Sequence, residues 1–155
     1  MPLTIRPVCA ADADIVADFN ARLALETENK HLEPHTIRAG VAAMIADPAK
    51  GFYFVAEFDG AIVGQLGVTR EWSDWRNGDF WWIQSVYVTP QARRRGVFAS
   101  LYRHVLQAAL AHGNVIGVRL YVEHDNHAAQ ATYKKLGMAM TSYQVMEACP
   151  IDAFE

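Results

Sequence analysis

The chain has few cysteines and no long apolar run. Only two of its 155 residues are cysteine, Cys9 and Cys149, and two cysteines in a chain of this length are typical of reduced thiols in a cytosolic protein. No uninterrupted apolar stretch approaches the ~20 residues that span a bilayer. The segment from Met1 to Arg6 lacks the charged-then-apolar pattern of a secretory signal. We therefore expect a cytoplasmic protein without a membrane segment.

A broad excess of positive charge is also missing. The formal net charge is −3, whereas binding to a nucleic-acid backbone needs an extended basic surface. The three consecutive arginines at 93–95 are therefore interpreted as a local site for one ligand. No P-loop lysine follows the adjacent glycine, and no dinucleotide-binding glycine pattern occurs. Both absences disfavour a nucleotide triphosphatase and a dinucleotide-dependent enzyme.

Low-complexity segments, repeats and linkers are absent as well. Hydrophobic residues make up 52% of the chain and charged residues 20%, which is typical of a globular protein. A length of 155 residues suits one ordinary domain with a single core. We therefore predict one ordered domain over residues 1–155.

The hydrophobic pattern alternates between strand and helix periods. It predicts strands at 4–8, 52–58, 61–69, 80–88, 115–122 and 138–147, and helices at 10–25, 35–46, 96–112 and 126–136. Asp12 would cap the first helix, and Asp59-Gly60 would supply the positive φ angles of a tight hairpin. A hairpin followed by alternating strands and helices predicts an α/β fold with a mixed, mostly antiparallel sheet covered by helices.

The most informative segment is the junction between a strand and a helix at 86–101. The strand pattern stops at Pro90, crosses the arginines and opens a helix at Gly96. Amide groups in the first turn of a helix have no partner within the helix, and the helix dipole favours an anion there. Glycine lets the backbone approach a ligand closely. The junction therefore predicts a site for the diphosphate of a nucleotide-like cofactor.

Two sequence blocks resemble one known family. Arg93-Arg94-Arg95-Gly96-Val97-Phe98 resembles the acetyl-CoA signature of the GNAT acetyltransferase superfamily, which reads Arg or Gln, two residues, Gly, any residue, then Gly or Ala. Phe98 departs from the small residue at the last position. Residues 120–138 resemble the family's later strand, asparagine, helix, tyrosine and Leu-Gly ending, with Met138 in place of the commoner phenylalanine.

This resemblance implies a GNAT-like acyl-CoA N-acyltransferase fold and an acetyl-CoA-dependent N-acetyltransferase, in which an amine attacks the thioester directly in a ternary complex. Tyr133 would act as general acid, because a phenol with a reference pKa of about 10 is protonated near neutral pH and can protonate the leaving thiolate. The residues implied in cofactor binding are Val86, Tyr87, Val88, Arg93, Arg94, Arg95, Gly96, Val97, Phe98, Ala99 and Asn126. Asn126 would equally well cap its helix.

The sequence indicates the residues that would bind the amine acceptor less clearly. Residues 71–82 combine acids and tryptophans in a predicted loop, and Glu28, Trp72 and Trp75 are the candidates for binding a cationic amine. Core packing or a homodimer interface would explain the tryptophans as well. Gln84 cannot act as general base, and the sequence does not choose among four acids as the base: Glu26, Glu28, Glu71 and Asp74.

Two histidine pairs raise the question of a metal site. Pro34 interrupts the helix that would align His31 with His35, and the pair His124 and His127 lacks an obvious third ligand. We expect no metal. A non-catalytic acyl-CoA-binding regulatory module remains the alternative to an enzyme, and the sequence leaves the amine acceptor unidentified.

Overall fold

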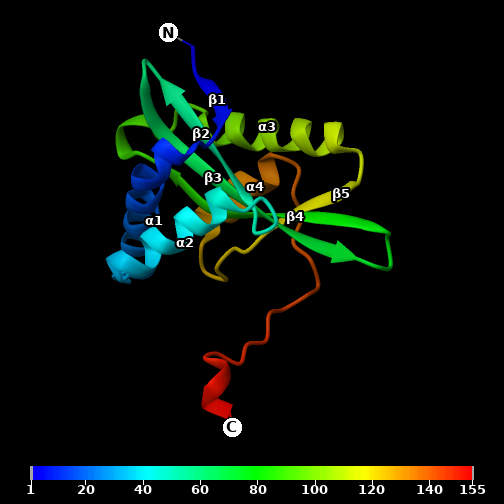
Figure 1. Cartoon of the computed structure of the whole chain (residues 1–155). Helices are drawn as coiled ribbons and strands as arrows, with labels where there is room; N and C mark the ends of the chain where they lie inside the picture. The colour runs from blue at the N-terminus through cyan, green and yellow to red at the C-terminus, as the bar shows by residue number, and fades with distance from the viewer. Residues whose placement is uncertain (1, 155) are drawn as a thin grey trace. The chain divides into compact units, whose positions relative to one another are not determined.

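The computed structural model describes the backbone of residues 2–154 (Figure 1). The chain forms two compact units, Met1–Tyr121 and Val122–Glu155. We call the first the sheet unit and the second the C-terminal unit. The single domain over residues 1–155 stays a prediction.

The sheet unit contains five strands in the order β1-β2-β3-β4-β5. The first four strands pair antiparallel, and β5 lies parallel to β4. This arrangement confirms the predicted mixed, mostly antiparallel sheet. The strands are β1 (Thr4–Pro7), β2 (Phe52–Phe58), β3 (Ala61–Ser73), β4 (Gly78–Val88) and β5 (Val115–Leu120).

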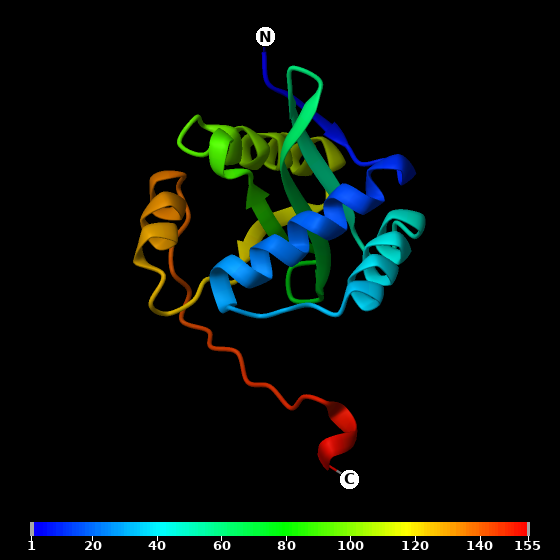
Figure 2. The same ribbon diagram turned by 90° about the vertical axis from the view of Figure 1, so that its left-hand side faces the viewer.

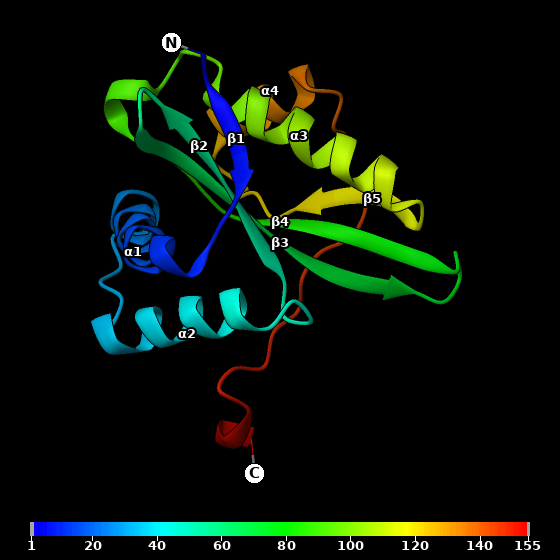
Figure 3. The ribbon, with the colours of Figure 1, turned by 45° about the horizontal axis from the view of Figure 1, so that its top comes forward.

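Helices cover both faces of this sheet. Helices α1 (Ala13–Glu28) and α2 (Pro34–Ala46) lie on one face, and α3 (Val97–His112) lies on the other (Figure 3). Helix α1 crosses the strands on its side (Figure 2). The helix predicted at 96–112 is confirmed as α3, and its apolar side chains at helical spacing are buried: Val97, Leu101, Val105 and Ala109.

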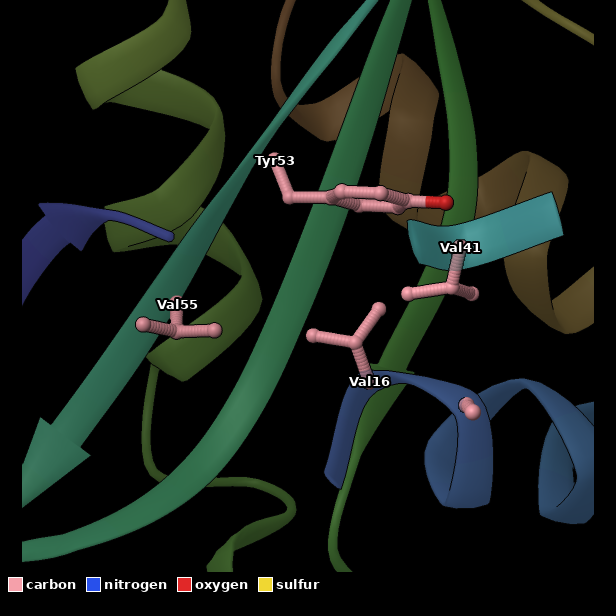
Figure 4. Close-up of a cluster of buried hydrophobic side chains, with 5 residues drawn as sticks. Val16, Val41, Tyr53 and Val55 are labelled. Atoms are coloured by element: carbon pink, nitrogen blue, oxygen red, sulfur yellow. The ribbon is translucent and has the colours of Figure 1, made fainter. Parts of the chain in front are cut away.

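Alternate residues of β2 pack against the two helical layers, as the strand period requires. Tyr53 and Val55 point toward α1 and α2, where they meet Val16 and Val41 (Figure 4). The ring of Phe54 points the other way and lies 4.6 Å from that of His104 in α3, centroid to centroid. The sheet is therefore the middle layer of the unit.

The region predicted as a loop at 71–82 is mostly strand. Strands β3 and β4 continue their pairing to Ser73 and Gly78, so Trp72 is a strand residue and only Asp74 to Asn77 form the turn. Asn77 takes the positive φ of 51° that the turn requires. The loop prediction was wrong because cross-strand pairing extends the hairpin through its polar and aromatic residues.

Asp12 does not cap α1 as predicted. It occupies the position before the helix, but its side chain makes no capping hydrogen bond. Its carboxylate instead accepts from both Nη atoms of Arg6, at 2.7 and 3.0 Å, and from the backbone N–H of Cys9 at 2.9 Å. The guanidinium is a stronger donor than a helix amide, so the ion pair decides the orientation of the carboxylate.

The C-terminal unit contains α4 (His127–Lys135). Residues 138–149 of this unit form no strand, so the predicted strand at 138–147 was wrong. Alternating apolar residues specify which side chains would share a face, but they do not supply the neighbouring strand that a β-strand requires. Among the helices described, none is both long and apolar enough to cross a membrane.

Candidate functional site

The end of β4 has an open edge. Strand β4 pairs with β5 only over Asp79–Ile83. On that side, Gln84–Val88 have no strand partner among the described residues. The two parallel strands separate after Ile83 and Leu120. An extended ligand can add to such an edge through main-chain hydrogen bonds. Val86, Tyr87 and Val88, which the sequence assigned to cofactor binding, lie on this edge.

The turn from β4 to α3 follows directly. Gly96 precedes α3 with a φ of +78°, and a Cβ built there meets no atom within 4 Å. The first turn of α3 has no acidic residue, and Gly96 provides no side-chain cap. Val97 and Ala99 supply amides of this first turn, whose N–H groups lack acceptors within the helix. The turn therefore fits the predicted diphosphate.

The three arginines of the turn differ in their surroundings. Arg94 and Arg95 are exposed, and Arg94 has a positive φ of 62°. Arg93 instead turns back to the protein, where its Nε donates to the carbonyl oxygen of Val88 at 2.9 Å and its Nη2 donates to Oε2 of Glu26 at 2.6 Å. Its guanidinium is thus partly neutralised, and Arg94 and Arg95 carry the charge of the exposed turn.

Glu26 is also bound to β4. Its Oε1 accepts from the hydroxyl of Tyr87 at 3.2 Å, and the buried Tyr87 ring lies 5.0 Å from the ring of Phe19 in α1, centroid to centroid. Both carboxylate oxygens of Glu26 therefore accept hydrogen bonds from other side chains of the protein. This engagement makes Glu26 a poorer candidate for the general base than the sequence alone suggested.

A buried amide supports β4 at the start of the open edge. Gln65 of β3 is 0% exposed, and its Nε2 donates to the carbonyl oxygen of Ser85 at 3.0 Å. Ser85 has a φ of +53°, an uncommon value for a residue other than glycine. The sequence reasoning missed Gln65, although a polar residue inside the apolar run 61–68 was a usable signal.

Glu71, another candidate base, lies in a polar cluster on β3, β4 and β5. Its Oε1 accepts from Nε1 of Trp82 at 3.2 Å and from Nη1 of Arg119 at 3.0 Å. The Trp82 ring lies 4.6 Å from that of the exposed Tyr121, centroid to centroid. Arg119 and Tyr121 were not predicted, because their approach to Glu71 and Trp82 depends on the parallel pairing of β4 and β5.

The other predicted acceptor residues lie at different places in the sheet unit. Glu28 is the last residue of α1 and is exposed. Trp72 and Trp75 are 57% and 86% exposed at the tip of the β3–β4 hairpin. At about 3.3 Å per strand residue, this tip lies roughly 20 Å along β4 from Ser85. The structure thus does not bring the two tryptophans together with the open edge.

Tyr133 and Asn126 belong to the C-terminal unit. Burial raises the pKa of the Tyr133 phenol above its ordinary value of 10.0, which keeps the hydroxyl protonated at neutral pH. Asn126 caps α4, since its Oδ1 accepts from the N–H of Ala129 at 3.1 Å. The catalytic role of Tyr133 and the cofactor contact of Asn126 stay predictions.

Comparison with known proteins identifies similar chains. Residues 17–138 match the model of the Acetyltransferase (GNAT) family. Phosphinothricin N-acetyltransferase from Streptomyces viridochromogenes is 32% identical over 114 residues, which are 72% of this chain and 61% of that protein. The matched region thus spans about three-fifths of the length of this relative.

Solved structures agree with this match. A possible acetyltransferase from Clostridium difficile 630 is 42% identical, with a TM-score of 0.90 over 96% of this chain and 97% of that chain. A predicted acetyltransferase from Clostridium acetobutylicum, solved with acetyl-CoA, has a TM-score of 0.78 over 95% of this chain and 96% of that chain. At 14% identity, the second structure shows similarity of fold alone.

Proposed function

Because the chain belongs to the GNAT acetyltransferase family, a family of enzymes that use acetyl-CoA, we propose that it transfers an acetyl group from acetyl-CoA to a primary amine. The family and the fold class predicted from the sequence are thereby confirmed. The observation that carries the proposal is the Gly96 turn, which lies directly beside the open edge of β4. The turn binds the diphosphate of the donor, and the open edge binds its extended arm.

The turn would hold the anionic part of the donor. The amides of Val97, Phe98 and Ala99 donate to phosphate oxygens, and Arg94 and Arg95 add positive potential at the same place. Phe98 does not prevent this arrangement, because amides of the backbone make the contacts. The missing Cβ of Gly96 leaves the space through which the ligand reaches them.

The open edge would hold the pantetheine arm. Main-chain groups of Val86 and Val88 bind it as an added strand, whereas Tyr87 pairs with Gln65 of β3 and packs its side chain against α1. Acetyl-CoA supplies an activated thioester, on whose carbonyl carbon the amine nitrogen forms its new bond as the carbon–sulfur bond breaks. A backbone N–H of β4 stabilises the negative charge that develops on the carbonyl oxygen.

Two proton transfers complete the reaction. The Tyr133 hydroxyl donates its proton to the departing sulfur. Its raised pKa means that the hydroxyl is protonated before this transfer. The amine gives its proton to a base. Among the acids considered, Glu71 binds the side chain of Trp82, one residue before the end of the paired part of β4, and we rank it first for this step.

We propose a small-molecule or peptide amine as acceptor. A tryptophan contact at the hairpin tip suits only an acceptor long enough to span the roughly 20 Å to Ser85 along β4. The aromatic pair Trp82 and Tyr121 lies closer to the open edge and suits a short acceptor. A cytoplasmic location and a homodimer remain predictions from the sequence.

Two measurements test the proposed function. Calorimetry should detect binding of coenzyme A, and thiol release from acetyl-CoA should rise with at least one member of a panel of polyamines, amino acids, aminoglycosides and peptides. Binding of coenzyme A without thiol release for any amine would favour the non-catalytic acyl-CoA-binding module. Absence of binding would contradict both functions.

A further inference from the structure

The pairing of β3 with β4 contains a bulge at the start of the open edge. Gln65 pairs with Tyr87 and Gly67 pairs with Gln84. One residue of β3, Leu66, therefore lies opposite both Ser85 and Val86. An extra residue of this kind bends the strand and interrupts its ladder. The positive φ of Ser85, +53°, lies in this bulge.

Gln65 provides the hydrogen bond that the bulge requires. It pairs with Val55, so its side chain lies on the sheet face that packs against α1 and α2. From there its Nε2 donates to the carbonyl oxygen of Ser85 at 3.0 Å. The Oε1 of Gln65 is buried and has no hydrogen-bond partner among the described residues. Burying a glutamine in an apolar strand is costly, which sets Gln65 apart from an ordinary core residue.

The bond to Gln65 also fixes the neighbouring amide. The carbonyl of Ser85 and the N–H of Val86 belong to one planar trans peptide, in which the two groups point in opposite directions. The N–H of Thr89 donates to the carbonyl oxygen of Val63 in β3 at 2.9 Å. Because the N–H groups of successive strand residues point to opposite sides, those of Val88 and Val86 point away from β3. On that side β4 has already separated from β5. The amide therefore faces the open edge.

We propose that Gln65 is a positioning residue that holds the Ser85–Val86 peptide so that the N–H of Val86 is aimed at the carbonyl oxygen of the acyl donor. This inference rests on the proposed acetyltransferase function. An amide that is already oriented stabilises the developing oxyanion without having to reorient during the reaction. Gln65 acts only through the backbone and does not touch the substrate.

Three variants test the role of Gln65. Gln65→Leu keeps the approximate volume and removes the donor, so kcat should fall about tenfold or more, while KM for acetyl-CoA stays within about threefold. Gln107→Leu makes the same exchange at an exposed position of α3 and should leave both constants unchanged. Equal kcat for Gln65→Leu and the wild type, with both folded, would overturn the proposal.

Gln65→Glu gives a signature that a merely structural role would not. The introduced carboxyl group is buried, which raises its pKa, and its protonated form still donates to the Ser85 carbonyl. Its ionised form has no proton to donate. The kcat of this variant relative to the wild type should therefore fall as pH rises through that pKa. A constant ratio across pH 5–9 would contradict the proposal.

Amide NMR relaxation separates this inference from the proposed function. In the unliganded protein, the amide of Val86 should show exchange between conformations on the μs–ms timescale in Gln65→Leu and not in the wild type, because the peptide is no longer held in one orientation. Equal relaxation of this amide in the two proteins would overturn the positioning role of Gln65 alone. A wild-type protein that binds coenzyme A and never releases thiol would overturn the proposed function, whatever the relaxation shows.

Discussion

Oε2 of Glu26 lies 2.6 Å from Nη2 of Arg93, although 67 positions separate the two residues in the chain. Through this ion pair and the hydroxyl of Tyr87, the last turns of α1 are joined to β4 and to the turn before α3. Arg93 also holds the carbonyl of Val88. The conformation of the turn therefore depends on a helix from the first part of the chain.

Replacing Glu26 with glutamine should weaken binding more than chemistry. The side chains of the pair are 44% and 40% exposed, and such pairs contribute at most about 1 kcal/mol, which equals an about fivefold change in affinity. We therefore expect KM for acetyl-CoA to rise by no more than about fivefold, with a smaller change in kcat. Steady-state kinetics measure both. A 100-fold loss of kcat, together with loss of the basic group from the pH profile, would instead identify Glu26 as the general base.

Gly96→Ala should reduce the affinity for coenzyme A. An alanine at a φ of +78° costs about 1 kcal/mol or more of folding free energy, and its Cβ occupies the space through which phosphate approaches. Gly60→Ala is a matched control, because Gly60 has a φ of +77° and a Cβ there also meets no atom within 4 Å. Both variants should lose similar stability in denaturant unfolding. Calorimetry should show at least about tenfold weaker binding for Gly96→Ala alone, and equal binding by the two would reject the turn as the phosphate site.

Tyr133→Phe should reduce kcat by about 100-fold or more, because general acid catalysis contributes factors of this size. The fold should be retained, since only the hydroxyl is lost. Burial raises the Tyr133 pKa above 10.0, so loss of the acid should not depress the wild-type rate until the pH exceeds 10. Tyr143→Phe, in an exposed part of the same unit, is the control and should turn over normally. Normal turnover by Tyr133→Phe would refute its role as the acid.

Asp12→Asn should lower the free energy of unfolding by about 2–3 kcal/mol, because Asp12 is buried and its hydrogen bonds involve charged groups. Arg6 holds the pKa of Asp12 far below its ordinary value of 3.8. A carboxyl group with a lowered pKa in the folded state stabilises the protein above its unfolded-state pKa. That stabilisation is lost as the pH falls below about 4. Urea unfolding at pH 7 and at pH 3 should show the variant and the wild type converging at low pH, and a constant difference would contradict this account.

The secondary structure was largely predictable because it depends on local periodicity. The hairpin at Asp59-Gly60 needs two positive φ angles, and the structure has 53° and 77° there. Helix α3 ends at His112, as predicted, and Gly113 follows it with a φ of +84°. The failures at 71–82 and 138–147 concern whether a strand finds a partner, which depends on residues elsewhere in the chain.

The turn at Gly96 was predictable for the same local reason, whereas its surroundings were not. Glu26 was one acid among four in the sequence, and only packing of α1 on β4 brings it to Arg93 and Tyr87. Gln65 meets Ser85 across 20 positions through the pairing of β3 with β4. Such contacts follow from register, and register depends on how the whole sheet buries its apolar faces.

The amino-acid sequence by itself determined the family, the order of helices and strands in the sheet unit, and the glycine turn with its arginines, because each depends on residues close together in the chain. Tertiary structure decided which acids are occupied by ion pairs, where β4 leaves β5, and which buried amide holds the bulge. Those features arise where distant segments pack, since a buried polar group must find its partner wherever folding places one.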